Sequence, residues 1–398
     1  MITAEYPGLT AVTYGQRVER LRRLATQAGI HTVLLRSPAS LLYFAGVTEL
    51  SVIRPTWMVV PRAGQCTIVL PRLETDGVLL ATWVEDLREW VEWPEPDLSE
   101  DWADPLVDVL KEHGAASERI GVESDVVAVN AWRTLEGRLP GAELVDAGRL
   151  LTRLRTIKEP VELDLMRIGG KVAAAQIAAA REAIAVGVPE YELALAARAA
   201  GTRVAAEALG ADYHSISPVV PGVLIMGAGP NRSAMAHPRA STNRIGAGDL
   251  VQMCFCGPNY YTYQLGFDRP IFCDADELTD EQRQLLSVGL EATAAALEAV
   301  RPGIAANEVH AAARRVVEDA GIAEQRAHRT GRGVGASEAE PPELRESDAT
   351  ILEVGMTFTV EPGIYVPGVG GVRFGDTVAV TECGYEMLTP APYGWDGR

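Results

Sequence analysis

The stretch His328–Gly335 reads HRTGRGVG and sets one arginine, Arg332, between two glycines. Because glycine has no side chain, such a segment can bring the backbone close to a ligand. A planar guanidinium at this point suits a carboxylate or a developing oxyanion, and it cannot lose its proton to bind a metal ion. The simpler interpretation is a surface turn, so the role of Arg332 depends on what surrounds it.

Histidine exchanges protons near neutral pH, and the chain has six histidines. We expect three of them to be solvated, because they fall at the edges of expected elements or on a helix: His31, His113 and His310. Three remain as candidates for a site: His214, His237 and His328.

Cys254 and Cys256 stand two positions apart in an apolar segment. A zinc site built on them needs two further ligands, which the sequence does not supply. We therefore expect two small side chains in a buried strand. The five cysteines are too few and too scattered for a disulfide framework, which favours a cytoplasmic protein.

The first part of the chain alternates between helix-like and strand-like segments. Apolar residues at helical spacing predict helices over 15–29 and 104–114, and short apolar runs predict strands over 31–37 and 119–124. Residues 56–71 are typical of a hairpin with its turn at 62–65. Strands that alternate with helices predict an α/β domain.

The later part groups its helices beside strands. Pro160 followed by Glu162 is typical of a helix start. Three more helices are expected over 191–209, 278–300 and 306–321, and strand-rich segments over 248–257, 260–272, 356–366 and 371–384. This pattern predicts an α+β domain. We place the boundary between Thr152 and Lys158, which gives domains of residues 1–155 and 156–398.

The composition narrows the class of partner. The chain has 398 residues, of which 47% are hydrophobic, and its formal net charge is −18. Such an acidic protein repels nucleic acid and anionic membranes, so we expect a small-molecule substrate. No apolar run approaches the length of a membrane span, and the N-terminus lacks the pattern of a signal peptide.

Seven segments in order resemble the creatinase, aminopeptidase P and prolidase family. They are LRTIKEPVELDLMR at 154–167, GPNRSAMAH at 229–237, GAGDLV at 246–251, RPGIAANEVH at 301–310, TGRGVG at 330–335, LEVGMTFTVEPGIYVPGVGGVRFGDTVAVTECG at 352–384 and MLTP at 387–390. The resemblance covers nearly the whole chain. It implies a C-terminal pita-bread domain of α+β class, preceded by a smaller α/β domain of the creatinase N-terminal type.

Metal-dependent members of that family hold two divalent ions with Asp, Asp, His, Glu and Glu. By resemblance these positions fall, in order, on Cys254, Gly266, Arg332, Glu361 and Gly375, so only Glu361 keeps its ligand. Glycine offers no donor atom, and a guanidinium repels a cation. By this resemblance the chain lacks most of the side chains that would bind the two ions, which in such centres activate a water molecule. We expect an enzyme without a metal or other cofactor.

Within this family, creatinase itself looks like a metal-free member, which hydrolyses a C–N bond with a histidine and carboxylates. The resemblance places its histidine on His237, in a segment one residue longer here, and its carboxylates on Glu361 and Asp268. An arginine that helps to hold the substrate carboxylate across the creatinase dimer interface resembles Arg54, in VIRPTW. Another creatinase substrate-binding arginine falls near Glu338, so creatine itself is not the predicted substrate.

We predict a metal-independent hydrolase of a non-peptide C–N bond in a small amidine, guanidino or cyclic amide molecule. It is expected to act as a homodimer with its sites near the subunit interface. The predicted catalytic residues are His237, Glu361 and Asp268. The predicted substrate-binding residues are Arg54, Arg332, Tyr261, Tyr263 and Glu340. Of these, Tyr261 and Tyr263 are expected to share one face of a strand.

Alternatives remain open at each level. Glu361 can brace its strand, Asp268 can pair with Arg269 or Arg373, and Arg332 can pair with Glu361 instead of a substrate. For the whole protein, the alternatives are a metal-free lyase, decarboxylase or ring-opening enzyme, an Xaa-Pro metallopeptidase with unusual ligands, and a non-catalytic binding protein.

Overall fold

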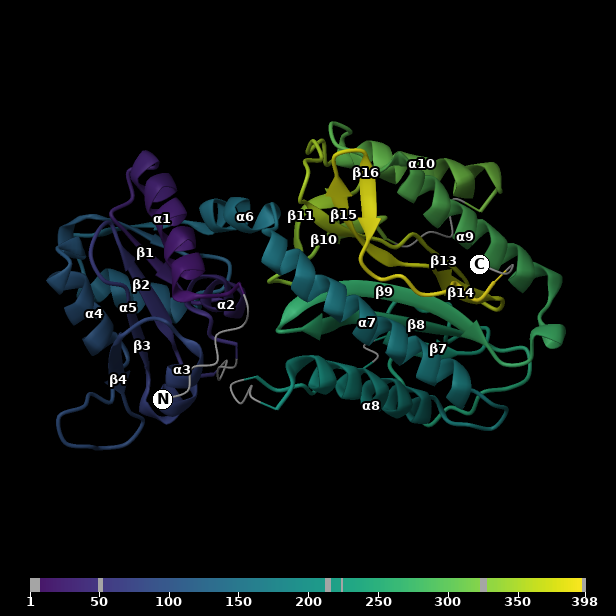
Figure 1. The fold of residues 1–398 in the computed structure, drawn as a ribbon, viewed down its shortest axis with the longest axis horizontal. Coiled ribbons are helices and arrows are strands. Elements are labelled where there is room, and N and C mark those ends of the chain that lie inside the picture. The colour runs from purple at the N-terminus through teal and green to yellow at the C-terminus, as the bar shows by residue number, and fades with distance from the viewer. Residues whose placement is uncertain (1–7, 49–52, 212–215, 223–224, 323–327, 396–398) are drawn as a thin grey trace. The chain divides into compact units, whose positions relative to one another are not determined.

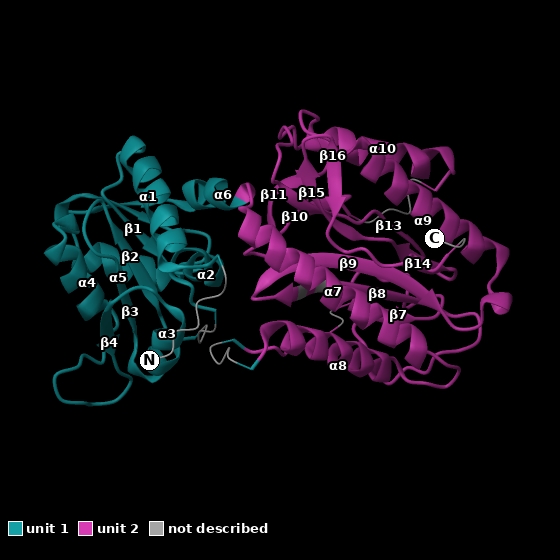
Figure 2. Cartoon of the chain, in the orientation of Figure 1, with its two compact units in different colours: residues 1–155, 211–216 teal, residues 156–210, 217–398 magenta. Residues whose placement is uncertain are grey.

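The computed structural model describes residues 8–48, 53–211, 216–222, 225–322 and 328–395. The chain forms two compact units (Figure 2). Unit 1 comprises residues 1–155 and 211–216, and unit 2 comprises residues 156–210 and 217–398. None of the helices within the described ranges is both long and apolar enough to cross a membrane.

Unit 1 is a mixed sheet with helices. Its helices are α1 (Ala11–Gln27), α2 (Pro38–Ala45), α3 (Thr75–Ala81), α4 (Ala103–Glu112), α5 (Val129–Arg138) and α6 (Gly148–Thr156). Its strands are β1 (Thr32–Leu35), β2 (Trp57–Pro61), β3 (Thr67–Pro71), β4 (Asp86–Trp90), β5 (Arg119–Val122) and β6 (Glu143–Asp146). The sheet order is β4-β3-β2-β1-β5-β6 (Figure 1). The antiparallel β2–β3 pair confirms the predicted hairpin, and the parallel β1–β5 and β5–β6 pairs confirm an α/β unit.

Both faces of the unit 1 sheet are buried at β1, β2 and β3, which explains why these strands are nearly continuous apolar runs. Neighbouring residues of β2 belong to different apolar clusters, since Met58 and Val60 pack in one and Trp57 and Val59 in the other. Side-chain oxygens accept hydrogen bonds from backbone N–H groups at the starts of some of these helices. Thr10, for example, closes a capping box at the start of α1.

Unit 2 carries two helix pairs with strands between them (Figure 1). Its helices are α7 (Pro160–Ala183), α8 (Glu190–Leu209), α9 (Asp280–Ala299) and α10 (Ala306–Asp319). Its strands are β7 (Ile225–Ala228), β8 (Leu250–Tyr260), β9 (Tyr263–Phe272), β10 (Gly331–Gly333), β11 (Glu340–Leu344), β12 (Thr357–Val360), β13 (Gly363–Val366), β14 (Gly370–Arg373), β15 (Asp376–Thr381) and β16 (Gly384–Met387). Pro160 begins α7 as predicted, and a capping box between Glu159 and Glu162 supports it.

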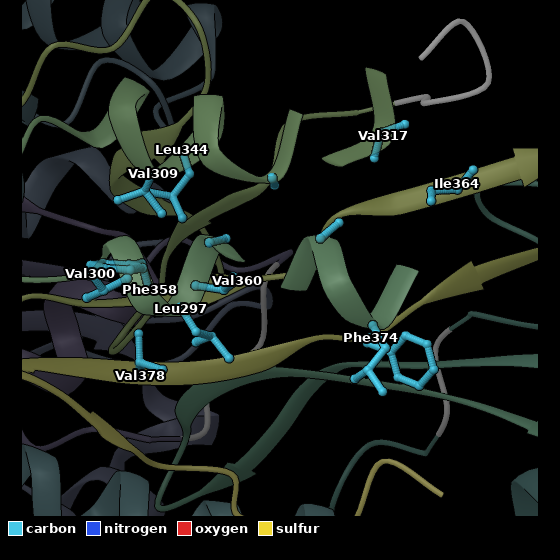
Figure 3. Close-up of a cluster of buried hydrophobic side chains, with 14 of the residues drawn as sticks. Leu297, Val300, Val309, Val317, Leu344, Phe358, Val360, Ile364, Phe374 and Val378 are labelled. Carbon is cyan, nitrogen blue, oxygen red and sulfur yellow. The ribbon is translucent and has the colours of Figure 1, made fainter. Parts of the chain in front are cut away.

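The strands of unit 2 form three sheets, ordered β7-β8-β9, β11-β10-β12-β15-β16 and β13-β14. Neighbouring strands in these three sheets pair antiparallel, which agrees with the predicted α+β class for this half. Residues of α7 and α8 pack on β7, β8 and β9 in one apolar cluster. Residues of α9 and α10 pack on β12, β14 and β15 in another, which Figure 3 shows.

The expected strand over 260–272 is wrong at its beginning. β8 ends at Tyr260 and β9 starts at Tyr263, so Tyr261 and Thr262 form the two-residue turn between them. Both have positive φ, +54° and +60°, a pair of values typical of a type I′ hairpin turn. The predicted shared face of Tyr261 and Tyr263 is therefore incorrect. The sequence lacks the Asn-Gly or Gly-Gly that usually marks such a turn.

Candidate active site

Strand alternation directs one set of side chains away from the α9–α10 core. Phe358 and Val360 of β12 lie in that core, so Thr359 and Glu361, which alternate with them, point the other way. In β13 the same alternation buries Ile364 in the core (Figure 3) and turns Gly363 and Tyr365 to the opposite side.

The next strand repeats the pattern. Val372 and Phe374 lie in the α9–α10 core, which leaves Arg373 on the same side as Tyr365. Gly363 and Arg373 are partners in the β13–β14 register, so their side-chain directions coincide.

β8 and β9 supply the facing side chains. Phe255 and Phe267 pack in the α7–α8 core, so their neighbours Cys254 and Asp268 point away from it. Cys254 and Asp268 are directly opposite in the antiparallel register. Asp268 exchanges two backbone hydrogen bonds with Gly375, each 3.0 Å long, which joins the two layers at this point.

The β8–β9 pair and the strands that face it thus bring together seven side chains. They are called the polar cluster below: Cys254, Asp268, His328, Arg332, Glu361, Tyr365 and Arg373. Two salt bridges, one side-chain hydrogen bond and mutual electrostatic effects on their pKa values connect them.

Arg332 and Glu361 form a buried ion pair. Arg332 Nη1 donates to Glu361 Oε1 over 2.5 Å, and Arg332 Nε donates to the Glu338 carbonyl over 2.8 Å. Thr359 Oγ1 donates to the same carboxylate oxygen over 2.8 Å. Burial opposes the charge on Glu361, but the Arg332 and Arg373 guanidiniums outweigh it and hold the pKa of Glu361 at about 2. Of the alternatives left open for Arg332, the structure shows the pair with Glu361.

Asp268 is 1% exposed, and burial raises its pKa to about 6. Arg373 opposes this rise and the Glu361 carboxylate adds to it. Arg373 Nη2 lies 3.0 Å from Asp268 Oδ1, whereas Arg269 pairs with Asp376. Apart from this ion pair and the Cys254 thiol, which lowers the pKa of Asp268, neither carboxylate oxygen has a partner within the described ranges, and Arg373 Nε has none. Such buried polar atoms are typical of a site that binds a polar ligand or water.

His328 and Tyr365 form the third contact of the polar cluster. His328 Nε2 lies 2.9 Å from the Tyr365 hydroxyl, and His328 Nδ1 lies 2.7 Å from the Arg329 carbonyl. Burial, together with the charge of Arg373, lowers the pKa of His328 to about 4, so the imidazole is neutral at pH 7. Burial raises the pKa of Tyr365 well above its ordinary range.

The residues present do not fit the dinuclear metal centre that the family resemblance implies. A Cβ atom at Gly375 would lie 2.0 Å from Asp268 Oδ2, and one at Gly266 would lie 2.3 Å from Thr359 Cγ2. Neighbouring side chains therefore fill the space of two ligands, and the Arg332 guanidinium stands at a third. The described ranges contain no group of three or more His, Cys, Asp or Glu side chains arranged to hold a metal ion.

His237 lies apart from the polar cluster in the described contacts. It is exposed, in the segment after β7. The backbone of Met226 donates to the Pro238 carbonyl over 3.0 Å, and the neighbouring Ile225 pairs with Cys254. The segment that carries His237 therefore runs beside β7, and about three strand spacings of 4.8 Å separate it from β9, which carries Asp268.

The predicted substrate-binding residues fall in different surroundings. The Glu340 carboxylate and Lys158 Nζ form an ion pair of 2.9 Å, and both side chains are 1% exposed. Tyr263 is fully buried and Tyr261 is 9% exposed. Arg54, in unit 1, pairs with Glu92 over 2.7 Å, and both side chains are partly exposed.

Two further expectations about histidines can be compared with the structure. His310 is not solvated as predicted: it is 7% exposed on the core side of α10, and its Nδ1 lies 2.8 Å from Thr330 Oγ1. His328, considered from the sequence as a candidate site residue, lies in the polar cluster. His214 is outside the described residues, as is the side chain of Cys256.

Sequence reasoning missed Tyr365, and it left open whether Asp268 pairs with Arg269 or Arg373, of which the structure shows Arg373. The available signal was alternation. In MTFTVEPGIYV and GVRFG, single polar or glycine residues interrupt apolar ones at every second position. That period places the polar residues on one face, opposite the core.

Comparisons with known proteins show the family of the chain. The family model described as metallopeptidase family M24 matches residues 164–382, and that of the creatinase/prolidase N-terminal domain matches residues 17–157. The agropine synthesis cyclase of Rhizobium rhizogenes is 34% identical over 96% of each chain. Creatinase of Bacillus sp. strain B-0618 is 27% identical over 95% of this chain and 91% of its own. The crystal structure of dipeptidase PepE from Mycobacterium ulcerans has 30% identity and a TM-score of 0.81, and the match covers 96% of this chain and 97% of that one.

Proposed function

Because this chain belongs to metallopeptidase family M24 and carries a creatinase/prolidase N-terminal domain, we propose that it is an enzyme of that fold which works without metal ions. Its reaction is the hydrolysis of a non-peptide C–N bond in a small polar molecule. The observation that carries the proposal is the 2.5 Å pair between Arg332 and Glu361. A permanent cation sits on the one carboxylate that remains from the family's ligand set.

The charges of the polar cluster support acid–base chemistry on a polar substrate. Arg332 and Arg373 are cations, Glu361 is held as an anion, and Asp268 changes charge near pH 6. A carboxyl group with a pKa near the working pH is an efficient proton donor and acceptor. In this proposal Asp268 transfers the proton. The two guanidiniums stabilise the negative charge that develops when water adds to the scissile carbon.

Glu361 has a positioning role in this scheme. Its carboxylate accepts from Arg332 and Thr359 at one oxygen, Oε1. The ion pair fixes the orientation of Arg332 toward the polar cluster, and Oε2 stays available to orient water or a substrate N–H group.

His237 keeps the acid–base role that the resemblance implies for it. Support is limited to its position, since its segment runs beside β7, whose Ile225 pairs with Cys254. An exposed imidazole exchanges protons with solvent freely, which suits a group that activates water at the open side of a site.

Arg54 and a homodimer belong to the same proposal. Arg54 would bind the substrate carboxylate near the subunit interface, as its counterpart does in creatinase. Its exposed pair with Glu92 contributes less than about 1 kcal/mol to stability. An Arg54→Ala variant therefore tests binding without unfolding: the expected result is a raised KM in a protein that light scattering shows to be dimeric.

Ring closure is a second candidate reaction. The relative at 34% identity is named a cyclase, and the match covers 96% of both chains. A cyclisation that expels water or an amine passes through the same kind of tetrahedral adduct as hydrolysis, in the opposite direction. The same guanidiniums and carboxyl group would serve it.

A substrate screen on metal-free protein tests the proposal. Chelator-treated enzyme is offered small amidines, guanidines, cyclic amides and hydroxy acids, and products are followed by NMR. We expect turnover that added metal does not increase, and a fall in kcat/KM of about 100-fold or more in His237→Ala and in Asp268→Asn. His113→Gln, on the surface of unit 1, is the control. Xaa-Pro cleavage that requires added Mn, Co or Zn would overturn the proposal.

A further inference from the structure

The tautomer of His328 follows from its two partners. Its Nδ1 lies 2.7 Å from the carbonyl oxygen of Arg329, which can only accept, so Nδ1 carries the proton. The other nitrogen, Nε2, is then an acceptor. Because Nε2 lies 2.9 Å from the Tyr365 hydroxyl, Tyr365 donates its proton to His328.

A glycine makes this contact possible. A Cβ atom at Gly363 would lie 2.5 Å from His328 Nε2 and 2.6 Å from the Tyr365 hydroxyl oxygen. No side chain of any size fits between these two atoms and β13. Gly363 is thus the residue type that the His328–Tyr365 contact requires at this position.

The pair extends from the buried part of the polar cluster to its edge. Tyr365 is 5% exposed, and Arg373, Asp268, Cys254 and Glu361 all act electrostatically on its hydroxyl. The side chain of His328 is only partly buried. Tyr365 therefore lies against the buried charges, and the side chain of His328, which contacts its hydroxyl, is the more exposed of the two.

Asp268 needs such a connection if it transfers protons. Its side chain is 1% exposed, yet a group that takes up a proton in each turnover must release it to solvent. We propose that Tyr365 and His328 act as one proton relay between the buried site and solvent. The inference rests on the proposed acid–base function of the polar cluster and adds the route by which that cluster exchanges protons.

Transfer through the pair is concerted. A separated tyrosinate–imidazolium pair is strongly disfavoured, since the pKa of Tyr365 is raised and that of His328 is lowered to about 4. Instead, the Tyr365 oxygen accepts a proton from the site as its own proton passes to His328 Nε2. A water molecule or the reacting group of the substrate completes the path from Asp268. Tyr365 ends unchanged, and the imidazolium releases its Nδ1 proton to solvent. Exchange with solvent water then moves the remaining proton from Nε2 to Nδ1 and restores the starting tautomer.

The charges around His328 keep its imidazole neutral, so that Nε2 is free of a proton between transfers. The positive charges of Arg373 and Arg329 disfavour protonation of the ring, and the Glu361 carboxylate only partly offsets them. At neutral pH Nε2 therefore carries no proton and can accept one. A proton from Asp268 reaches it against an unfavourable equilibrium, because the pKa of Asp268 is raised and that of His328 is lowered, and then leaves rapidly.

Nitrogen NMR of the intact protein tests the relay without any substrate. Side-chain ¹⁵N shifts at pH 7 should show His328 neutral, with the proton on Nδ1 and a hydrogen-bonded Nε2. In Tyr365→Phe the Nε2 signal should move toward that of an unbonded acceptor. A ring protonated at Nε2, or at both nitrogens, at pH 7 overturns the relay whatever the substrate is.

Steady-state kinetics, measured with a substrate found in the screen described above, supply the second readout. Tyr365→Phe and His328→Ala should each lower kcat by about 100-fold with little change in KM, and the double variant should be no worse, because the two groups act as a unit. Imidazole in solution should restore His328→Ala, more strongly with more basic derivatives. His113→Ala is the control. Unchanged kcat and pH profile in His328→Ala would overturn the relay, whereas absence of metal-free turnover in the parent enzyme would contradict only the proposed function.

Discussion

Arg332 and Glu361 approach to 2.5 Å inside unit 2, and their side chains are only 11% and 6% exposed. One is fixed in β10 and the other follows β12, two strands that pair with each other. Each charge is therefore held against the other in a place where water cannot replace a lost partner.

Breaking this pair should destabilise the protein strongly. We expect Arg332→Met and Glu361→Gln each to lower the free energy of unfolding by about 3 kcal/mol or more, because each leaves one buried charge uncompensated. The double variant should recover much of the loss. Urea denaturation at pH 7 measures all three. Lys111→Met, which removes an exposed pair with Asp108, is the control and should change stability by less than about 1 kcal/mol. Additive losses in the double variant would contradict the coupling.

The fold and the family could be predicted from the sequence because their signals are distributed along the chain. Apolar periodicity marked α7 to α10 and the β2–β3 hairpin, and seven ordered segments carried the resemblance that the family models confirm. The substitution of Arg332 for a metal-binding histidine was visible for the same reason. Which of its possible partners Arg332 takes was not, because Glu361 lies on another strand, 29 residues away.

The pH dependence of stability should reveal Asp268. Its pKa of about 6 in the folded protein lies above its ordinary value of about 3.9, so between pH 4 and 6 the native state holds a proton that the unfolded state has lost. The stability that this group contributes is present below pH 4 and is lost as the pH rises through 6. The slope can reach about 1.4 kcal/mol per pH unit. Denaturation of Asp268→Asn at pH 4 to 7 should lack this slope, and an unchanged slope would assign it elsewhere.

Glu361 should act in the opposite sense at lower pH. Its pKa of about 2 lies below its ordinary value, so its contribution is present above about pH 4.5 and is lost as the pH falls toward 2. Acid unfolding measured by circular dichroism should therefore begin at higher pH in Arg332→Met, because removal of the guanidinium raises the pKa of Glu361. An unchanged acid midpoint would show that Arg373 alone holds this carboxylate.

The residues that sequence reasoning placed wrongly share a physical cause. Tyr261 has the β propensity of a strand residue, but the register between Tyr260 and Tyr263 puts it in a turn. His310 is polar, but it has a hydrogen bond to Thr330 that makes its burial tolerable. In both cases a contact between separate segments outweighs the local preference of the residue.

Glu340 distinguishes substrate binding from a structural role. Its carboxylate and Lys158 Nζ form an ion pair of 2.9 Å with both side chains 1% exposed. If this contact is structural, Glu340→Gln should lower the free energy of unfolding by about 3 kcal/mol or more and leave KM unchanged. Urea denaturation and steady-state kinetics measure the two effects. A raised KM with unchanged stability would support the substrate-binding role predicted from the sequence.

Gly375 should tolerate no side chain while Asp268 is present. A Cβ atom there would lie 2.0 Å from Asp268 Oδ2, so Gly375→Ala is expected to cost about 1–3 kcal/mol by overpacking. Gly137→Ala, in an open position on α5, is the control and should not destabilise. The clash should shrink in Gly375→Ala/Asp268→Gly, which a double-mutant cycle measures.

The same clash bears on metal binding. Gly375→Glu alone would return a carboxylate to the position that holds a ligand in metal-dependent relatives, but Asp268 and the Arg332 guanidinium would still occupy the space and oppose the charge of an ion. We therefore expect calorimetry with Mn²⁺ to show no binding to Gly375→Glu. Stoichiometric binding to this single variant would mean that the polar cluster can rearrange around a metal ion, and it would contradict the view that the side chains of Asp268 and Arg332 exclude one.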